Sequence, residues 1–281
     1  MALITPPLAF AYCTDNLTGT PAAATPGTAV TAGGSANTDG TAVTLLSALG
    51  HDAHFICITL NGGAGSSTAT DALLDILVDP AGGTSFSELI SDLACGYTAS
   101  SVAGTGAPMA RWFFPLWIAA GTTIGAQVRS AAAGITKRVI CTVYGEPSRP
   151  DMWWCGQGVE TLGANPATSK GTTITPGSSG AAGTYTNVGG PTTYRYGAVQ
   201  LSLQGPDATA TARGGYWNIG ADSARLPGSP TLYTSMNTSE QLAFANGMPI
   251  WCDIPAGKQL QVAGTLSGTT ENYNACLHGV Y

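Results

Sequence analysis

Apolar and polar residues alternate along several short stretches of the chain, and each stretch has a counterpart in the second half. Residues 54–62 contain the pattern Ile-x-Ile-x-Leu, and residues 197–205 contain Val-x-Leu-x-Leu. Alternation with a period of two is typical of a strand that buries one face. We therefore predict a strand in each segment, with the residues between the aliphatic positions facing outward. These outward residues are Cys57, Thr59, Gln200 and Ser202.

Two further pairs of segments are separated by nearly the same length of chain. Residues 27–33 match residues 171–177, and residues 71–79 match residues 214–222 in the positions of their apolar side chains. Taken alone, residues 71–79 also fit a helix, because carboxylates recur at every fourth position. Their counterpart begins Gly-Gly-Tyr-Trp-Asn-Ile-Gly, which is a poor helix former, so we predict strands in both.

A Pro-x-Trp motif opens the last part of each half. Residues 114–124 and 248–260 both place Trp two residues after Pro, followed by Ala-Gly and an aliphatic residue. This order is typical of a buried strand, a Gly turn and a second strand. Closing strands are predicted at residues 138–145 and 274–281, aligned on their cysteines with a slip of one residue left open.

One pair of segments carries the signals of a short helix. Residues 87–89 and 239–241 both begin with Ser-Glu, and each precedes an apolar stretch that ends in Gly96 or Gly247. Ser followed by Glu is a helix start signal and Gly a stop signal. We therefore predict a helix of one or two turns in each half.

The paired segments indicate a tandem duplication, which decides the fold class. Short strands with regular turn signals in each copy predict an all-β protein of two tandem, jelly-roll-like β-sandwiches with an extended N-terminal arm. The predicted boundaries are 1–26 for the arm, 27–145 for the first sandwich, 146–169 for a linker and 170–281 for the second sandwich. The linker carries Trp153 and Trp154, which we expect to pack against a sandwich or a neighbour.

Composition narrows the function classes. Charged residues make up 9% of the 281 residues, against about 25% in ordinary globular proteins. Because 44% of the chain is hydrophobic, we expect a folded protein whose neutral surface is partly covered by neighbours. A net charge of −6 argues against nucleic-acid binding. No apolar run reaches the roughly 18 residues that span a membrane. The N-terminus lacks the basic region of a signal peptide, so we expect synthesis in a cytoplasm.

Candidate catalytic and metal-binding groups do not form a recognised motif. His51 and His54 supply two ligands, and two ligands do not define a metal site. No Gly-x-Ser-x-Gly elbow is present. Asp75 and Asp79 are not a duplicated acid pair, because Asn218 replaces one carboxylate in the second copy. We therefore expect a protein that is not an enzyme and has no catalytic residues, metal or cofactor.

Seven cysteines are present, without a Cys-x-x-Cys pair, and their number is odd. The repeat places Cys252 in an inward row and Cys141 and Cys276 in closing strands, which predicts three buried thiols. The remaining four are expected to be more exposed: Cys13, Cys57, Cys95 and Cys155. These four are either ordinary free thiols or candidates for disulfides between chains once the protein leaves the reducing cytoplasm.

One segment of each half resembles a strand–turn–strand of β-sandwich proteins in tailed-bacteriophage particles. The first segment reads Pro-Leu-Trp-Ile-Ala-Ala-Gly-Thr-Thr-Ile-Gly-Ala-Gln-Val-Arg, and its echo in the second half reads Ile-Pro-Ala-Gly-Lys-Gln-Leu-Gln-Val. The resemblance implies a non-enzymatic virion component, either a capsid decoration or minor capsid protein or a neck or tail accessory protein. Capsid decoration is the first choice, because an arm and neutral faces suit lateral packing. The implied location is the virion. The implied partners are the major capsid protein or neck and tail proteins, and further copies of this chain.

The alternative is a glycan- or receptor-binding module on a tail, neck or fibre. Jelly rolls occur in lectins, and aromatic rings can stack on pyranose rings. The candidate stacking residues are Trp153, Trp154, Tyr194 and Tyr196. The two hypotheses differ in one observable feature, namely whether these rings are exposed in a groove or buried in the linker and strand cores.

Overall fold

The computed structural model shows a protein built from strands. The residues that it describes are 12–17, 27–61, 71–95, 110–145, 154–178, 180–204, 213–226, 232–236, 244–245, 249–268 and 272–281. Within these ranges the one helical element is a 3-10 turn, η2 (Pro166–Thr168). The all-β prediction is confirmed.

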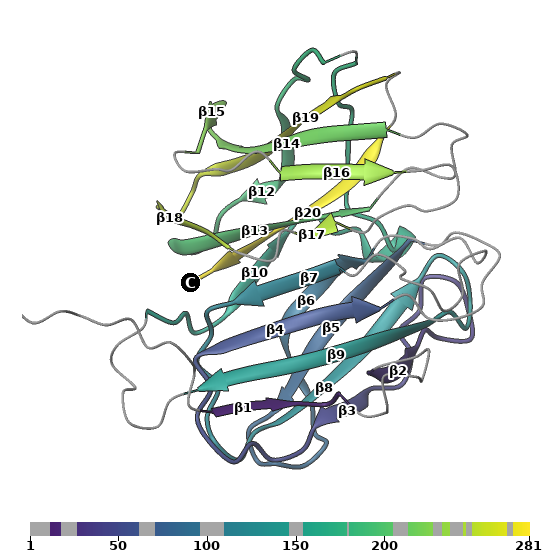
Figure 1. The fold of residues 1–281 in the computed structure, drawn as a ribbon, viewed down its shortest axis with the longest axis vertical. Helices are drawn as coiled ribbons and strands as arrows, with labels where there is room; N and C mark the ends of the chain where they lie inside the picture. Colours follow the sequence, from purple (N-terminus) through teal and green to yellow (C-terminus); the bar gives the residue numbers. More distant parts are fainter. Residues whose placement is uncertain are drawn as a thin grey trace, which may run out of the picture.

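The first sandwich contains two antiparallel sheets (Figure 1). One sheet has the order β1-β9-β4-β7, with β2 also beside β9. Its strands are β1 (Tyr12–Asp15), β2 (Thr28–Thr31), β4 (Phe55–Asn61), β7 (Ala110–Phe114) and β9 (Thr136–Gly145). The facing sheet contains, in order, β3 (Val43–Leu46), β8 (Thr123–Ser130), β5 (Ala72–Asp79) and β6 (Ser87–Cys95). Ile56, Ile58 and Leu60 point into the core between the sheets, as the alternation predicts.

The second sandwich repeats this arrangement. One sheet has the order β10-β20-β13-β17, with β11 beside β20 and β18 beside β13. Its strands are β10 (Val159–Leu162), β11 (Thr172–Ile174), β13 (Tyr196–Gln204), β17 (Phe244–Ala245), β18 (Ile250–Ile254) and β20 (Tyr273–Val280). The facing sheet contains β12 (Thr186–Pro191), β19 (Gln259–Leu266), β14 (Arg213–Ala221) and β15 (Ala224–Arg225), with β16 (Leu232–Met236) also beside β14.

Strand order supports the duplication. Each sheet of the first sandwich has the same order as its counterpart in the second, and this order defines a jelly roll. The register also settles the slip between the closing strands. Ile58 pairs with Cys141, and its counterpart Leu201 pairs with Leu277. Cys141 therefore corresponds to Leu277, one residue beyond Cys276.

The segment predicted as a short helix in the first half is a strand. Ser87–Cys95 forms β6, which pairs with β5 from Val78 to Ala72. Ile90 and Leu93 are buried in the core. The local Ser-Glu signal is overridden because pairing with β5 buries these side chains and satisfies the backbone. The counterpart, residues 239–241, lies outside the described residues.

Two segments placed outside the repeats in the sequence contribute strands. In the predicted arm, β1 pairs with residues 142–145 of β9, directly beyond the part of β9 that pairs with β2. In the predicted linker, β10 occupies the same place along β20. Alternation over four residues is too short to reveal such strands in the sequence.

The two sandwiches pack against each other through a seam that combines buried polar side chains with a small apolar cluster of Leu73, Ala94 and Cys276. The ends of β6 and β7 in the first sandwich lie on the outer face of β13 and β20 in the second (Figure 1). Backbone N–H groups of these edge strands find side-chain acceptors there. Ala94 N–H donates to Ser202 Oγ (3.3 Å), and Phe113 N–H donates to Gln200 Oε1 (3.1 Å). Gln200 and Ser202 face away from their own core, as predicted, but the first sandwich buries them.

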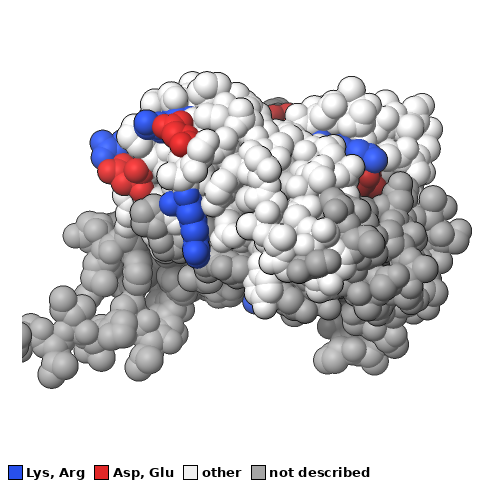
Figure 2. Space-filling model, turned by 90° about the horizontal axis from the view of Figure 1, so that it is seen from above, with Lys and Arg blue, Asp and Glu red and all other residues white. Residues whose placement is uncertain are grey.

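The surface carries few charges. Figure 2 shows one face on which blue and red atoms are sparse and stand mainly in oppositely charged groups, with uncharged atoms between them. In the described part of the chain, no helix is long and apolar enough to cross a membrane.

Candidate functional site

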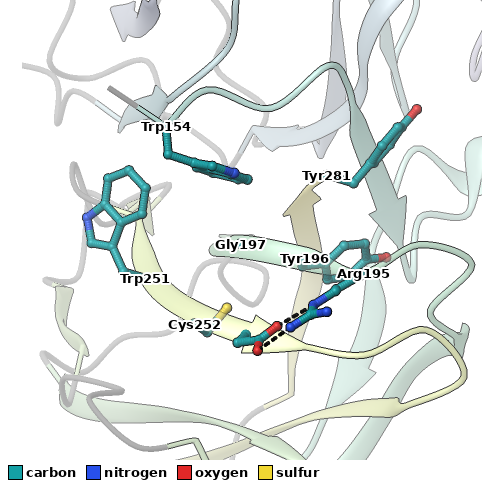
Figure 3. Close-up of a pocket in the computed structure, with 8 residues that line it drawn as sticks. Trp154, Arg195, Tyr196, Gly197, Trp251, Cys252 and Tyr281 are labelled. Atoms are coloured by element: carbon teal, nitrogen blue, oxygen red, sulfur yellow. Dashed lines mark hydrogen bonds and ion pairs between the residues drawn. The ribbon is translucent and has the colours of Figure 1, made fainter. Parts of the chain in front are cut away.

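A pocket opens on the second sandwich where β13 begins and β18 runs beside it (Figure 3). Its volume is about 500 Å³. The lining residues are Trp154, Arg195, Tyr196, Gly197, Trp251, Cys252, Asp253 and Tyr281. They come from four places in the chain: the segment before β10, the start of β13, strand β18 and the residue after β20.

A β-bulge shapes the pocket floor. Tyr196 pairs with Ile254 and Ala198 pairs with Trp251, so Gly197 alone faces the two residues between them on β18. A bulge of this kind bends a strand and redirects its side chains. Here it brings Cys252 and Asp253 to the pocket, beside Trp251 (Figure 3).

Glycine at position 197 provides the seat for Trp154. A Cβ atom at this position would lie 2.4 Å from the Trp154 ring, which is far inside van der Waals contact. The indole therefore packs directly on the backbone of β13. One side of the ring is held by protein, and 47% of the residue remains exposed.

The second tryptophan meets the first edge to face. The ring centroids of Trp154 and Trp251 are 5.9 Å apart, with an interplanar angle of 76°. Trp251 is 50% exposed, so the contact leaves much of both rings open to the pocket. Tyr281 forms another wall and stacks on Tyr194 with centroids 3.9 Å apart. Aromatic surface therefore faces the pocket from more than one direction.

A bidentate ion pair forms the polar side of the pocket. Arg195 Nε donates to Asp253 Oδ1 and Arg195 Nη2 donates to Asp253 Oδ2, both at 2.6 Å (Figure 3). The hydrogen bonds to Arg195, and then its charge, lower the pKa of Asp253. The same bonds and the Asp253 charge raise the pKa of Arg195. Both groups are therefore ionised at neutral pH, and their charges cancel locally.

A carboxylate behind the pocket holds Tyr196 in place. The Tyr196 hydroxyl donates to Glu160 Oε2, and Thr193 N–H donates to both Glu160 oxygens at 3.2 and 3.0 Å. Burial acts to raise the pKa of Glu160, but these hydrogen bonds outweigh it and lower that pKa. Glu160 is therefore a fixed anion, and it anchors the pocket wall.

The four stacking candidates separate into three groups. Trp154 lines the pocket with an exposed ring, and Tyr194 is exposed and packs behind Tyr281. Tyr196 is fully buried, because its ring covers Gly279 and its hydroxyl is engaged, so it has no free face. Trp153 lies outside the described residues.

Sequence reasoning missed Trp251, which it placed in a buried strand. Trp251 and its counterpart Trp117 are both half exposed, while Ile250 and Ile118 beside them are buried. Cys252, predicted to be buried, is only half-buried and lines the pocket. The motif was visible in the sequence. The bulge that brings Cys252 and Asp253 to the pocket was not.

The cysteines also differ from expectation. Cys57 and Cys95 are buried rather than exposed. Phe113, stacked on Phe55, is the partner of Cys57 in the sheet, and burial raises the pKa of Cys95 to about 12. Cys141 and Cys276 are buried, as predicted. All seven cysteines are free thiols within the single chain.

Of the candidates for a bond between chains, Cys13 is exposed and Cys155 is half-buried. Cys155 Sγ donates to the His54 carbonyl at 3.2 Å. A disulfide between chains stays a prediction for these two residues. His54 itself is buried, and the described residues contain no group of three His, Cys, Asp or Glu side chains placed to hold a metal.

No protein-family model and no curated protein matches this chain. Among solved structures, recombinant N-glycanase F (PNGase F) is similar with a TM-score of 0.32 and 9% identity, over 95% of each chain. The tandem CBM22-1–CBM22-2 domain of Paenibacillus barcinonensis Xyn10C has a TM-score of 0.25 and 10% identity, over 89% of this chain and 85% of that one. The VP2 subviral particle of infectious bursal disease virus has a TM-score of 0.21 and 10% identity, over 83% of this chain and 57% of the VP2 chain. Values this low carry no argument about function.

Proposed function

We propose that this protein binds carbohydrate, without chemical turnover, in the pocket of the second sandwich. The observation that supports this proposal is the pair of half-exposed tryptophans, Trp154 and Trp251, beside the fixed Arg195–Asp253 pair. A pyranose ring presents apolar C–H faces and a rim of hydroxyls. Aromatic rings stack on the C–H faces, and hydrogen-bond donors and acceptors at set positions bind the hydroxyls.

The arrangement differs from scattered surface aromatics. A single exposed tryptophan is ordinary on a protein surface. Here two of them converge with Tyr281 on one concavity, and Gly197 leaves space for Trp154 that any side chain would fill. The rings therefore need no rearrangement before they contact a ligand, which lowers the entropic cost of binding.

Tryptophan replacements test the proposal. We expect Trp154→Ala and Trp251→Ala to weaken binding to a panel of immobilised oligosaccharides at least about tenfold, or about 1.4 kcal/mol. Trp117→Ala is the matched control, because Trp117 is an equally exposed tryptophan (45%) at the equivalent place in the first sandwich and does not line this pocket. An equal loss in Trp117→Ala, or a wild-type protein that binds no sugar, would contradict the proposal. Release of shortened sugars would identify an enzyme.

A glycine replacement tests the pocket shape without removing a ring. Gly197→Ala places a methyl group where the Trp154 ring now lies, so we expect it to weaken binding about as much as Trp154→Ala. Gly190→Ala is the control, because a Cβ there meets open space and the backbone is not left-handed. Binding unchanged in Gly197→Ala would argue against Trp154 as the contact surface.

A structural role in a phage particle is the second candidate. The sparse charge on the surface supports it, because a neutral face loses little solvation when a neighbour covers it (Figure 2). The edge strand β1 carries an exposed cysteine, Cys13, and the exposed Leu17 lies two residues beyond the strand. Adding purified protein to particles that lack it tests this role. Stable decoration without any sugar would support it, and failure to attach would oppose it.

A further inference from the structure

The charges around the pocket also indicate which sugars it accepts, an inference that rests on the proposed carbohydrate binding. Among the described lining residues, two carry charged side chains, Arg195 and Asp253, and they neutralise each other through two hydrogen bonds. A further anion, the Glu160 carboxylate, holds Tyr196 from behind the pocket wall. Among the described lining residues, the one cation, Arg195, has a carboxylate partner.

We propose that the pocket selects uncharged sugars and rejects uronic acids and other acidic sugars. An acidic sugar would have to give up water around its carboxylate and lie beside the Asp253 carboxylate, with Glu160 as a second anion behind the pocket wall. Arg195 is already committed to one of them. A neutral sugar loses no charge solvation, and its hydroxyls use the remaining capacity of the ion pair. The guanidinium has five N–H donors and the carboxylate about four acceptor sites, of which the pair consumes two each.

Matched ligands test this selectivity on the unmodified protein. The probes are neutral gluco-, manno- and galacto-oligosaccharides and the same compounds oxidised at C6 to uronates. We expect the neutral form of the bound sugar to bind at least about tenfold more tightly than its uronate. We also expect added salt to narrow the gap, because salt screens repulsion between exposed charges.

Two charge variants locate the effect. Asp253→Asn keeps the shape of the side chain but leaves the Arg195 charge unbalanced, so we expect the ratio of uronate affinity to neutral-sugar affinity to rise about tenfold. Asp222→Asn is the control. Asp222 forms an exposed ion pair with Lys258 at 2.8 Å, and this pair does not line the pocket. The substitution therefore removes the same unit of charge from another place on the surface.

The possible results distinguish failure of the selectivity for uncharged sugars from failure of carbohydrate binding itself. Uronate binding as tight as neutral binding overturns the selectivity and leaves carbohydrate binding standing. An equal gain in Asp222→Asn also overturns it, because the effect would then follow the charge of the whole protein. If neither sugar form binds the unmodified protein, both proposals fail together. Because the comparison of sugar forms uses the unmodified protein, it does not depend on how a variant folds.

Discussion

At the scale of single residues, the chain combines a neutral surface with a strained acidic cluster. Arg129 lies between three carboxylates of the first sandwich, at 2.9 Å from Asp39, 3.8 Å from Asp75 and 3.9 Å from Asp92. One cation cannot balance three anions. Asp92 is also a non-glycine residue with a left-handed backbone (φ 54°). Burial, followed by the charge of Asp75, raises the pKa of Asp92 to about 6.

The first prediction follows from that pKa. Because the folded value (about 6) lies above the unfolded value (3.8), ionised Asp92 destabilises the fold above pH 6, and the penalty disappears as pH falls toward 4. We expect Asp92→Asn to raise the melting temperature at pH 8, with a gain that shrinks toward zero at pH 4. Thermal unfolding at several pH values measures this. A lower melting temperature for Asp92→Asn at pH 8 would contradict the argument.

At the scale of elements, the strands that could be predicted are those long enough to alternate. β4 and β13 are visible in the sequence because three aliphatic residues mark one face of each. β1 and β10 are only four residues long, and their partners lie far away in the chain. β6 was predicted as a helix because the pairing that overrides its local signal is not local. The pocket depends on a bulge between β13 and β18, and no residue pattern marks that bulge.

Asn16 decides whether β1 belongs to the fold. Its Nδ2 donates to Thr28 Oγ1 (2.9 Å) and to the Val139 carbonyl (3.0 Å), and its Oδ1 accepts from Cys141 N–H (2.7 Å). The side chain therefore fills the gap between β1 and β2 along β9. Without it, the buried Cys141 N–H has no acceptor.

The second prediction is that Asn16→Ala destabilises the protein by about 1–3 kcal/mol, which is the cost of leaving a buried backbone donor unsatisfied. Urea unfolding measures the change. Asp15→Ala is the control, because Asp15 is exposed and, among the described residues, its carboxylate accepts from the nearby Leu17 N–H, so we expect a change within about 0.5 kcal/mol. If Asn16→Ala were as mild as Asp15→Ala, β1 would be a detachable arm after all.

At the scale of the whole molecule, the seam makes one unit of two similar sandwiches. The outer face of β13 and β20 carries polar residues that a lone sandwich would show to water. Gln200, Ser202, Gln204 and His278 are instead buried there. Sequence alternation identifies these positions as facing away from the core of the second sandwich. It cannot show that the first sandwich covers them, because that depends on how two finished domains meet.

A chain of hydrogen bonds crosses this seam and returns to β6. Ala94 N–H donates to Ser202 Oγ (3.3 Å), and Ser202 Oγ lies 2.8 Å from His278 Nε2. On the other side of the ring, His278 Nδ1 lies 3.0 Å from Thr161 Oγ1, whose hydroxyl donates to the Ser91 carbonyl (2.6 Å). Because the Thr161 hydroxyl proton is donated to the Ser91 carbonyl, Thr161 Oγ1 is the acceptor for the Nδ1–H of His278. His278 Nε2 is then the acceptor for the Ser202 hydroxyl.

The last prediction concerns this chain of bonds. Burial lowers the pKa of His278 to about 3, so the ring is neutral in the folded protein and keeps its acceptor at Nε2. Ser202→Ala leaves the Ala94 N–H and His278 Nε2 without their partner, and we expect it to cost about 1–3 kcal/mol or more. We also expect urea unfolding, followed separately by fluorescence and circular dichroism, to change from coincident to separate transitions.

Thr59 occupies the position in the first sandwich that matches Ser202 in the second. Its Oγ1 accepts a long hydrogen bond from Arg111 Nε (3.4 Å) and lies 4.0 Å from Cys57 Sγ, and both partners belong to the same sandwich. Thr59→Ala should therefore cost less than Ser202→Ala and leave the transitions coincident. Acid adds an independent check. Unfolded histidine takes up a proton below about pH 6.5, so the contribution of His278 to stability declines as pH falls from there toward 3. If Ser202→Ala and Thr59→Ala behaved alike, the seam would contribute packing but not the coupling between the sandwiches.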